Sequence, residues 1–327
     1  MKKIFVTGGD GFLGSNLLDI LLERGYEVTV MVQPGRSTSL PGHPNLHQIE
    51  GDLLDQSAVV ALTAGMDAVI HIAAITDVWP PKHPKYWTVN VRGTQHIIDA
   101  CIEHKIKRLV HCSSASVFQY GSKDAPGTEE KPGQGGLLDY IDSKKKGQEV
   151  VLQAVQEKGL EAIVVNPTFM IGPKDSKPSS GAFMINVVQG KMPAYTNGGK
   201  NWVYVKDVAT AIANALSMGK IGEAYILGHE NLSYLEALRV IQDVSGCSIP
   251  SVRLPDSIFR AAGWIVGAAG KLLGFSPKIS HPVTVIGSQG HYFSAEKAVR
   301  DLQLPQTPIR QAFQESYDWF IQNQYLP

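Results

Sequence analysis

The chain has 327 residues, and its 30 basic and 30 acidic side chains cancel at neutral pH. A chain of this length can bury a large core without disulfides, and its balanced charge offers no field that would draw it to nucleic acid. The three cysteines, Cys101, Cys112 and Cys247, show no metal-binding spacing. These features favour a protein of a reducing compartment that holds no metal, has no nucleic-acid partner and acts on a small molecule. Because the N-terminus lacks the pattern of a signal peptide, we expect a cytoplasmic location.

The first half of the chain alternates short β-branched runs with amphipathic segments of helical length. This alternation is typical of βαβ units and predicts an α/β fold, a Rossmann doubly wound parallel sheet. The predicted strands are 4–6, 28–32, 46–50, 68–72, 109–112 and 162–165, and the predicted helices are 13–24, 56–64, 86–104 and 143–158. We therefore expect a dinucleotide-binding domain over residues 1–167.

The alternation loosens beyond Pro167, where runs rich in glycine, proline and serine appear. Residues 168–327 are predicted to form mainly a smaller, mixed substrate-binding region, with residues 202–228 returning to the first domain. The predicted elements of this second half are helices at 207–218, 234–244 and 309–322 and a strand at 224–227.

One apolar stretch, residues 257–275, approaches the length of a membrane span. Arg260 and Lys271 interrupt it and leave ten uncharged residues between them, fewer than the roughly 20 that a bilayer core requires. The pattern predicts no transmembrane span. It favours a buried or pocket-capping helix, with peripheral membrane contact as the alternative.

A glycine-rich turn, TGGDGFLG, follows the first predicted strand and precedes the first predicted helix. Glycine allows a tight turn and a close approach of the backbone to a pyrophosphate, and the amides at the helix N-terminus attract the anion. The order of strand, glycines and helix makes this a specific sign of dinucleotide binding. The residues predicted to contact the cofactor here are Thr7, Gly8, Gly11, Phe12, Leu13 and Gly14.

The second predicted strand ends without the carboxylate that often holds the adenosine ribose in NAD-binding units. Arg36 follows instead, with Ser37 and Thr38, and these could receive a 2′-phosphate. We therefore predict NADP as the preferred cofactor, with NAD as the alternative. Asp52, beside Leu53 after the third strand, is a predicted hydrogen-bond acceptor for adenine, although it could instead cap the following helix.

Tyr140 and Lys144 are spaced so that a helix places both on one face. A neighbouring ammonium lowers the pKa of a phenol, which can then exchange a proton with a substrate alcohol or carbonyl while a nicotinamide exchanges the hydride. Ser113 and Ser114 follow the fifth predicted strand, at the sheet edge where such folds bind ligands. We expect one of the two hydroxyls to polarise the substrate oxygen, the alternative for both being ordinary turn capping.

With these residues in place, the sequence resembles an extended short-chain dehydrogenase/reductase of the NAD-dependent epimerase/dehydratase superfamily, over nearly its whole length. It looks closest to the 3-beta-hydroxysteroid dehydrogenase and dihydroflavonol reductase branch, together with sequences labelled hopanoid-associated sugar epimerases. The motifs that carry the resemblance are TGGDGFLG at 7–14, GDL at 51–53, HIAA at 71–74, NVRGT at 90–94, CSSASVF at 112–118, YIDSK at 140–144, NPTFMIGP at 166–173 and WVYVKDVA at 202–209.

The resemblance implies a role for individual residues. It assigns the catalytic hydroxyl to Ser114, the acid/base to Tyr140 and nicotinamide-ribose binding to Lys144. It also implies that Ala73 and Ala74 line the adenosine half, that the backbone at Thr168 and Phe169, after Pro167, holds the carboxamide, and that Asn90 is a structural anchor. Two positions depart from the family pattern: Lys206 stands where an aspartate is frequent, and Gln33 replaces a commonly basic residue.

The expected activity is NAD(P)H-dependent interconversion of a carbonyl and a secondary alcohol on a fairly apolar small molecule. Trp79, Phe118, Phe169, Met170 and Trp202 are the residues expected on the substrate side. The alternative is a sugar-nucleotide epimerase or dehydratase with tightly bound NAD, which would need a cation for the diphosphate; the position that is usually arginine in those families is Lys200 here. By analogy with extended members, the helices at 86–104 and 143–158 are expected to form a homodimer interface.

Overall fold

The structure is a computed structural model that describes residues 2–35, 40–277 and 280–327. Seven parallel strands form its central sheet, in the order β3-β2-β1-β4-β5-β6-β9. Their bounds are β1 Lys3–Thr7, β2 Glu27–Val32, β3 Leu46–Glu50, β4 Ala68–His71, β5 Leu109–Cys112, β6 Ala162–Pro167 and β9 Ala224–Leu227. The chain reverses its direction of winding between β1 and β4, so a crevice forms beyond the carboxyl ends of these strands.

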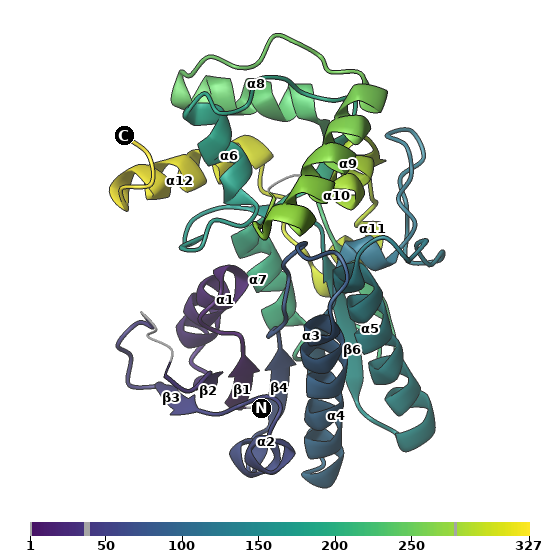
Figure 1. Ribbon diagram of the computed structural model, residues 1–327. Helices are drawn as coiled ribbons and strands as arrows, with labels where there is room; N and C mark the ends of the chain where they lie inside the picture. The colour runs from purple at the N-terminus through teal and green to yellow at the C-terminus, as the bar shows by residue number, and fades with distance from the viewer. Residues whose placement is uncertain (1, 36–39, 278–279) are drawn as a thin grey trace.

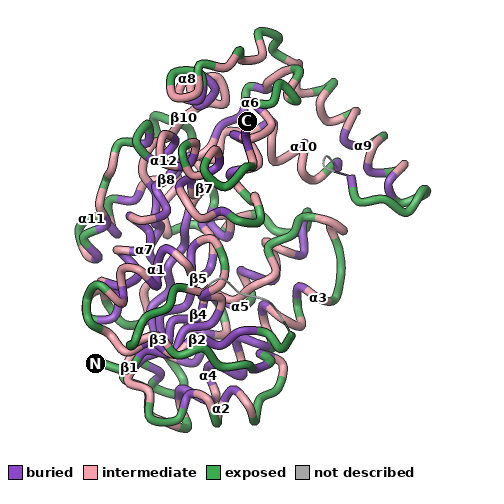
Figure 2. The backbone as a smooth tube through the Cα atoms, turned by 90° about the vertical axis from the view of Figure 1, so that its left-hand side faces the viewer, coloured by how far each residue is buried: buried purple, intermediate pink, exposed green. Residues whose placement is uncertain are grey.

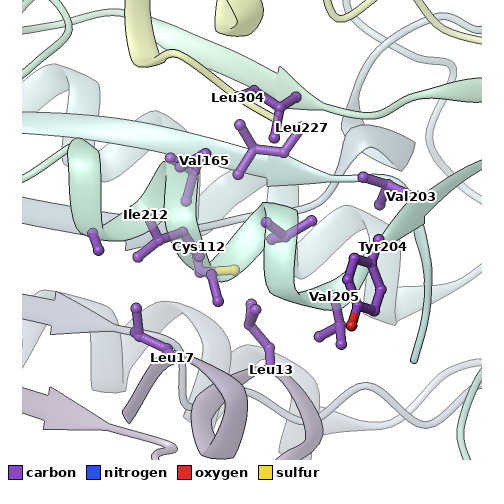
Figure 3. Packing of buried hydrophobic residues seen from close by; sticks show 14 of the residues in the cluster. Leu13, Leu17, Cys112, Val165, Val203, Tyr204, Val205, Ile212, Leu227 and Leu304 are labelled. Carbon is purple, nitrogen blue, oxygen red and sulfur yellow. The ribbon is translucent and has the colours of Figure 1, made fainter. Parts of the chain in front are cut away.

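Helices cover both faces of this sheet (Figure 1). α1 (Phe12–Glu23) and α7 (Val205–Asn214) pack against each other on one face, and α2 (Gln56–Thr63), α4 (Thr94–Glu103) and α5 (Asp139–Lys158) lie on the other. Successive side chains of β1 point to opposite faces of the sheet, so β1 contributes to the core on both faces. Ile4 and Val6 join the α1 and α7 side of the core, whereas Phe5 joins the α4 and α5 side. Figure 3 shows Leu13 and Leu17 of α1 facing the apolar side chains of the first layer.

A second, four-stranded sheet organises the C-terminal region. β8 (Gly199–Tyr204) pairs antiparallel with β10 (Glu230–Ser233) and parallel with β7 (Phe169–Ile171) and β11 (Gly290–His291). The helices around it are α6 (Gly181–Val188), α8 (Tyr234–Ser245), α9 (Asp256–Leu273), α10 (His281–Gly287), α11 (Glu296–Leu302) and α12 (Ile309–Gln322). This region lies beyond the carboxyl ends of the main strands (Figure 1), so it faces the crevice.

The segment 202–228 divides between the two parts of the molecule. α7 packs on α1 and β9 completes the main sheet beside β6, as the predicted return to the first domain requires. β8, by contrast, belongs to the second sheet. The strands of that sheet were not predicted because they are only two to six residues long and show no clear alternation.

The predicted helix over 86–104 is interrupted. It consists of α3 (Pro84–Trp87), a π-helical turn (Thr88–Gly93) and α4. Such turns insert a residue into a helix and re-aim the side chains that follow. α5 begins at Asp139, one turn earlier than predicted, so Tyr140 already lies within the helix.

α9 corrects the prediction of a buried helix over 257–275. Trp264 is 66% exposed and Leu272 is 86% exposed, and the buried residues of the helix are three glycines. Most of its large apolar residues are therefore exposed instead of lying in the core. Within the described residues, no helix is long and apolar enough to cross a membrane.

Candidate functional site

A cavity of about 580 Å³ opens at the carboxyl edge of the main sheet. It gathers residues from the first glycine turn, from the segments after β3 and β4, from the end of β5 and from the start of α5. The predicted site residues that line it are Gly8, Gly11, Phe12, Leu13, Gly14, Asp52, Leu53, Ala73, Ala74, Ser114, Tyr140, Lys144, Pro167 and Thr168. The fold thus brings together residues that are up to 160 positions apart in the chain.

The glycine turn fits a pyrophosphate for steric and electrostatic reasons. Gly8 has a φ of +74°, and a Cβ at Gly14 would lie 2.1 Å from the carbonyl oxygen of Gly8, so neither position accepts a side chain. Gly11, the residue before α1, provides no side chain to cap the helix, and the first turn contains no acidic residue. The first amides of α1 and its dipole are therefore available to an anion.

Thr7 does not line the cavity, in contrast to the prediction. It is fully buried, and its Oγ1 lies 2.7 Å from His71 Nδ1 and accepts a hydrogen bond of 3.3 Å from the Ala73 amide. Burial lowers the pKa of His71 to about 3, so this ring is neutral. Thr7 acts below the cavity, where it positions the backbone of Ala73.

At the opposite end of the cavity, Asp52 is free of the capping role that was its alternative. Asp55 caps α2, accepting from the Ala58 amide at 3.1 Å, whereas Asp52 accepts from the Leu54 amide in its own turn. Asp52 is exposed and lines the cavity, which suits an acceptor for adenine. Arg36, predicted to bind the 2′-phosphate, lies outside the described residues.

Tyr140 and Lys144 extend from the first turns of α5 into the cavity beside Ser114. Burial raises the pKa of Tyr140, and a hydrogen bond with Ser114 offsets only part of this effect. Lys144 is not among the groups that shift this pKa, so its predicted effect on the phenol stays a prediction. Lys144 Nζ instead donates a hydrogen bond of 2.6 Å to the Cys112 carbonyl, and burial lowers the pKa of this lysine.

The structure distinguishes the two candidate serines. Ser113 is buried, and its hydroxyl donates to the backbone carbonyl of Lys144 at 3.4 Å. Ser114 is partly exposed, and its Oγ lies 2.8 Å from Ser116 Oγ as well as bonding Tyr140. Ser113 therefore holds α5 against β5, although it also lines the cavity. Ser114 accepts from the Ser116 amide at 3.3 Å and so caps the short turn Ala115–Val117, as its alternative role predicts, while it lines the cavity beside Tyr140.

Two buried amides support the catalytic residues and were not predicted. Asn166 Nδ2, in β6, donates to the Ser114 carbonyl at 3.0 Å and to Gln148 Oε1 at 2.7 Å. Gln148 stands four residues after Lys144, on the same face of α5. That spacing, with the polar Asn166 in an otherwise apolar strand, is the sequence signal that could have identified them.

Asn90 makes the contacts of a structural anchor. Its side chain accepts from the Ile75 amide at 2.8 Å and donates to the Ile75 carbonyl at 3.0 Å and to Ser143 Oγ at 3.0 Å. Ile75 lines the cavity. The π-helical turn that contains Asn90 therefore ties the segment after β4 to the catalytic helix.

The contacts of the segment after Pro167 do not match the role predicted for it. The Thr168 amide donates to the Leu227 carbonyl at 3.0 Å, so it is not free to hold a carboxamide. The Phe169 ring packs edge-on against Trp202 at 4.8 Å instead of lining the cavity. Trp202 and Phe118 are buried as well, and of the residues predicted on the substrate side only Met170 lines the cavity.

The loop over residues 173–180 lines one side of the cavity. The sequence indicated only that the second region begins near this loop. Asp175 is buried and accepts from the amides of Ser179 and Gly181, so it holds the loop in shape. Asn16 Nδ2 of α1 donates to the Pro173 carbonyl at 3.0 Å. The lining residues that the sequence did not indicate are Asp10, Met31, Gln33, Gly51, Leu54, Ile72, Ile75, Thr76, Val89, Cys112, Asp175, Ser176, Lys177 and Ser179.

Comparison with known proteins assigns the chain to a family. Residues 4–228 match the model of the NAD dependent epimerase/dehydratase family. The chain belongs to this family. The predicted resemblance to extended short-chain dehydrogenases/reductases is thereby confirmed, and with it a NAD-binding Rossmann fold of the oxidoreductase type.

Individual relatives cover nearly the whole chain. A protein named "Putative dihydroflavonol 4-reductase" from Synechocystis sp. is 32% identical, over 98% of this chain and 95% of its own. A 3 beta-hydroxysteroid dehydrogenase/Delta 5-->4-isomerase from Mycobacterium tuberculosis is 27% identical, over 98% and 91%. Among solved structures, gox2253 superposes with a TM-score of 0.87 at 31% identity over the full length of both chains. The UDP-glucose 4-epimerase of Thermus thermophilus in complex with NAD superposes with a TM-score of 0.78 at 21% identity, over 98% of this chain and 99% of its own, which shows a shared fold.

The glycine turn supplies a first test of the site. We expect Gly14→Ala to raise the Kd for a nicotinamide dinucleotide by roughly tenfold to hundredfold, because the added Cβ forces α1 away from the Gly8 carbonyl. Gly42→Ala is the matched control, since a Cβ there meets nothing within 4 Å. Calorimetric titration measures both, and a Gly14→Ala protein that binds as tightly as the wild type would contradict the assignment.

Proposed function

We propose that the protein is an NADPH-dependent oxidoreductase that interconverts a carbonyl and a secondary alcohol on a fairly apolar small molecule. One observation supports this above others: Ser114, Tyr140 and Lys144 line the same cavity as the glycine turn at the start of α1. The names of the relatives, a dihydroflavonol reductase and hydroxysteroid dehydrogenases, agree with a substrate of this class.

The chain's own residues divide the work. A nicotinamide, when bound, supplies or accepts the hydride. The Tyr140 hydroxyl then gives a proton to the carbonyl oxygen in reduction or takes one from the alcohol in oxidation, with Ser114 as its hydrogen-bond partner. Lys144 would bind the nicotinamide ribose, and the glycine turn would hold the pyrophosphate.

The raised pKa of Tyr140 keeps the phenol in the protonated form at neutral pH. Reduction needs the phenol in its protonated form, and a raised pKa keeps the proton in place across the neutral range. The Lys144 ammonium would stabilise the phenolate formed when the proton leaves, because two opposite charges attract strongly in a buried site.

A nucleotide-sugar epimerase or dehydratase is the competing function. It would need a cation near the diphosphate of its substrate, and Lys200 stands where related enzymes of that kind carry arginine. Lys200 lies in β8 and is not among the described residues that line the cavity. Because Ser114, Tyr140 and Lys144 would serve either function, the position of Lys200 away from the cavity is what favours the reductase.

The two functions are separated by a substrate panel. We expect the purified protein to oxidise NADPH in the presence of an aromatic, steroid-like or β-keto carbonyl. The reaction is measured as the loss of absorbance of the reduced nicotinamide. UDP- and dTDP-sugars are tested in parallel by chromatography of the products. Turnover of a nucleotide sugar, with no NADPH consumed by any carbonyl, would replace the proposed function by its alternative.

Tyr140→Phe tests the proton donor. We expect the rate to fall by at least about a hundredfold, the usual contribution of a positioned acid/base, while the dinucleotide Kd stays nearly unchanged. In the wild type the reduction rate should fall as pH rises through the pKa of Tyr140, and the oxidation rate should rise. Tyr26→Phe, on the loop after α1, is the control and should behave as the wild type; activity of the Tyr140→Phe protein close to that of the wild type would remove Tyr140 from this role.

Arg36→Ala tests the preference for NADPH. We expect the variant to bind NADPH roughly tenfold to hundredfold more weakly, because one charge-assisted contact with the 2′-phosphate is lost, and to bind NADH as before. Arg310→Ala, on the exposed side of α12, is the control. Tighter binding of NADH than of NADPH by the wild type would overturn the preference. The cytoplasmic location and the homodimer through α4 and α5 stay predictions of the sequence.

A further inference from the structure

Large apolar side chains are concentrated on one exposed segment of the C-terminal region. Of the thirteen large apolar residues that are exposed in the described part of the chain, seven lie between positions 252 and 275. The five of them that belong to α9 are Ile258, Trp264, Ile265, Leu272 and Leu273, with Val252 and Phe275 just outside the helix. We call these five residues the outer face of α9.

The outer face cannot turn inward, because the opposite side of α9 carries glycines that lie close to α10 and to the segment before it. Gly263, Gly267 and Gly270 are the buried residues of the helix. A Cβ at Gly263 would lie 2.3 Å from Thr284 Oγ1, and one at Gly270 would lie 2.8 Å from the Cδ of Pro277. Rotation of α9 would bring larger side chains to these positions. The apolar residues are thus held outward by the packing of α9 on α10.

The segment around α9 also carries a local positive charge. Asp256 is the one acidic residue of α9, and no further Asp or Glu occurs up to Ala295, whereas Arg260, Lys271 and Lys278 lie in this stretch of the sequence, although the whole chain is balanced. Lys271 is exposed in the last turn of α9, next to Leu272 and Leu273. A basic side chain beside inserted leucines is the arrangement that anionic headgroups attract.

Position and length agree with a helix that lies on a surface. Figure 2 shows α9 at the edge of the molecule, away from the main sheet. Its 18 residues are not long and apolar enough to cross a bilayer, and Trp264 and Lys271 are the residue types that settle at the boundary between headgroups and acyl chains.

We propose that the outer face of α9 binds the surface of an anionic lipid membrane, with the helix in the plane of that surface. The apolar side chains enter the acyl boundary, and Lys271 remains among the headgroups. This docking is independent of the catalytic reaction, since none of the residues of the outer face lines the cavity.

The first experiment is co-sedimentation of the full chain with vesicles. We expect the protein to pellet with vesicles of phosphatidylcholine and phosphatidylglycerol in roughly equal parts, and several-fold less with phosphatidylcholine alone or at high salt, because surface charges are then screened. An absence of binding to the anionic vesicles at low salt would overturn the proposal, as would equal binding to both kinds of vesicle at all salt concentrations.

Variants locate the contact. The triple variant Ile265→Ser, Leu272→Ser, Leu273→Ser should lose at least about tenfold in vesicle affinity, because each inserted aliphatic side chain contributes separately. The control pair, Val299→Ser and Ile221→Ser, removes exposed apolar residues elsewhere and should bind as the wild type does. Circular dichroism and NADPH titration check that every variant is folded. Lys271→Glu is a second test that leaves the apolar residues in place, and it should weaken binding to anionic vesicles.

The competing occupant of this face is a second copy of the chain. Sedimentation velocity over a range of protein concentrations distinguishes the two. If the wild type forms a dimer that dissociates in the triple variant, and the wild type does not bind anionic vesicles, then the outer face of α9 is a surface for self-association and the membrane proposal is wrong. A blue shift of tryptophan fluorescence on adding anionic vesicles, absent in Trp264→Phe, would place this helix in the interface.

Discussion

The close approach of α1 to the ends of β1 and β4 is the constraint on which the site depends. A Cβ at Gly8 would lie 2.7 Å from the Ala73 amide nitrogen, and one at Gly14 would touch the Gly8 carbonyl. Only glycine lets the helix N-terminus stand directly above the strand ends, where its unbonded amides face the cavity. Thr7, bonded below to His71 and Ala73, keeps the two strand ends at this separation.

A second set of contacts joins the catalytic helix to the sheet. Lys144 donates to the Cys112 carbonyl, and Ser113 donates to the Lys144 carbonyl, so α5 and β5 hold each other in both directions. Asn166 extends this connection to β6 by bonding the Ser114 backbone. Buried polar contacts of this kind are costly to break, because a buried group that loses a partner is not compensated by water. They therefore keep Ser114, Tyr140 and Lys144 at the edge of the cavity before any ligand arrives.

The first half of the fold could be predicted because its elements obey simple periods. Leu109–Cys112 matches its predicted bounds and Glu27–Val32 differs from its predicted bounds by one residue, since each is a short, mainly apolar or β-branched run. The second sheet could not be predicted in this way. β11 has two residues, and β8 depends on three different partners that come from distant parts of the chain. Such strands are defined by tertiary contacts, which a local pattern does not contain.

The same distinction explains the outcome for single site residues. Some site residues can be recognised in the sequence because their chemistry requires one residue type at a given spacing. These are Gly8, Gly11, Tyr140 and Lys144. The roles of Thr168 and Phe169 cannot be recognised in this way, because whether an amide is free depends on the neighbouring strand. The Thr168 amide donates to the Leu227 carbonyl of β9. The pKa of Tyr140 is likewise a property of its surroundings, because burial raises it and the hydrogen bond with Ser114 offsets only part of that effect.

α9 shows a further limit of reading hydrophobicity as burial. Its apolar residues predicted a core helix, but the core contact of α9 uses glycines, whose lack of side chains lets α10 approach closely. Because the closest contacts use the smallest residues, the large side chains of the outer face point away from α10, while Phe259 packs toward Gly287. The exposed side chains of α9 are thus a direct consequence of how it packs, and burying them against another apolar surface would be favourable in water.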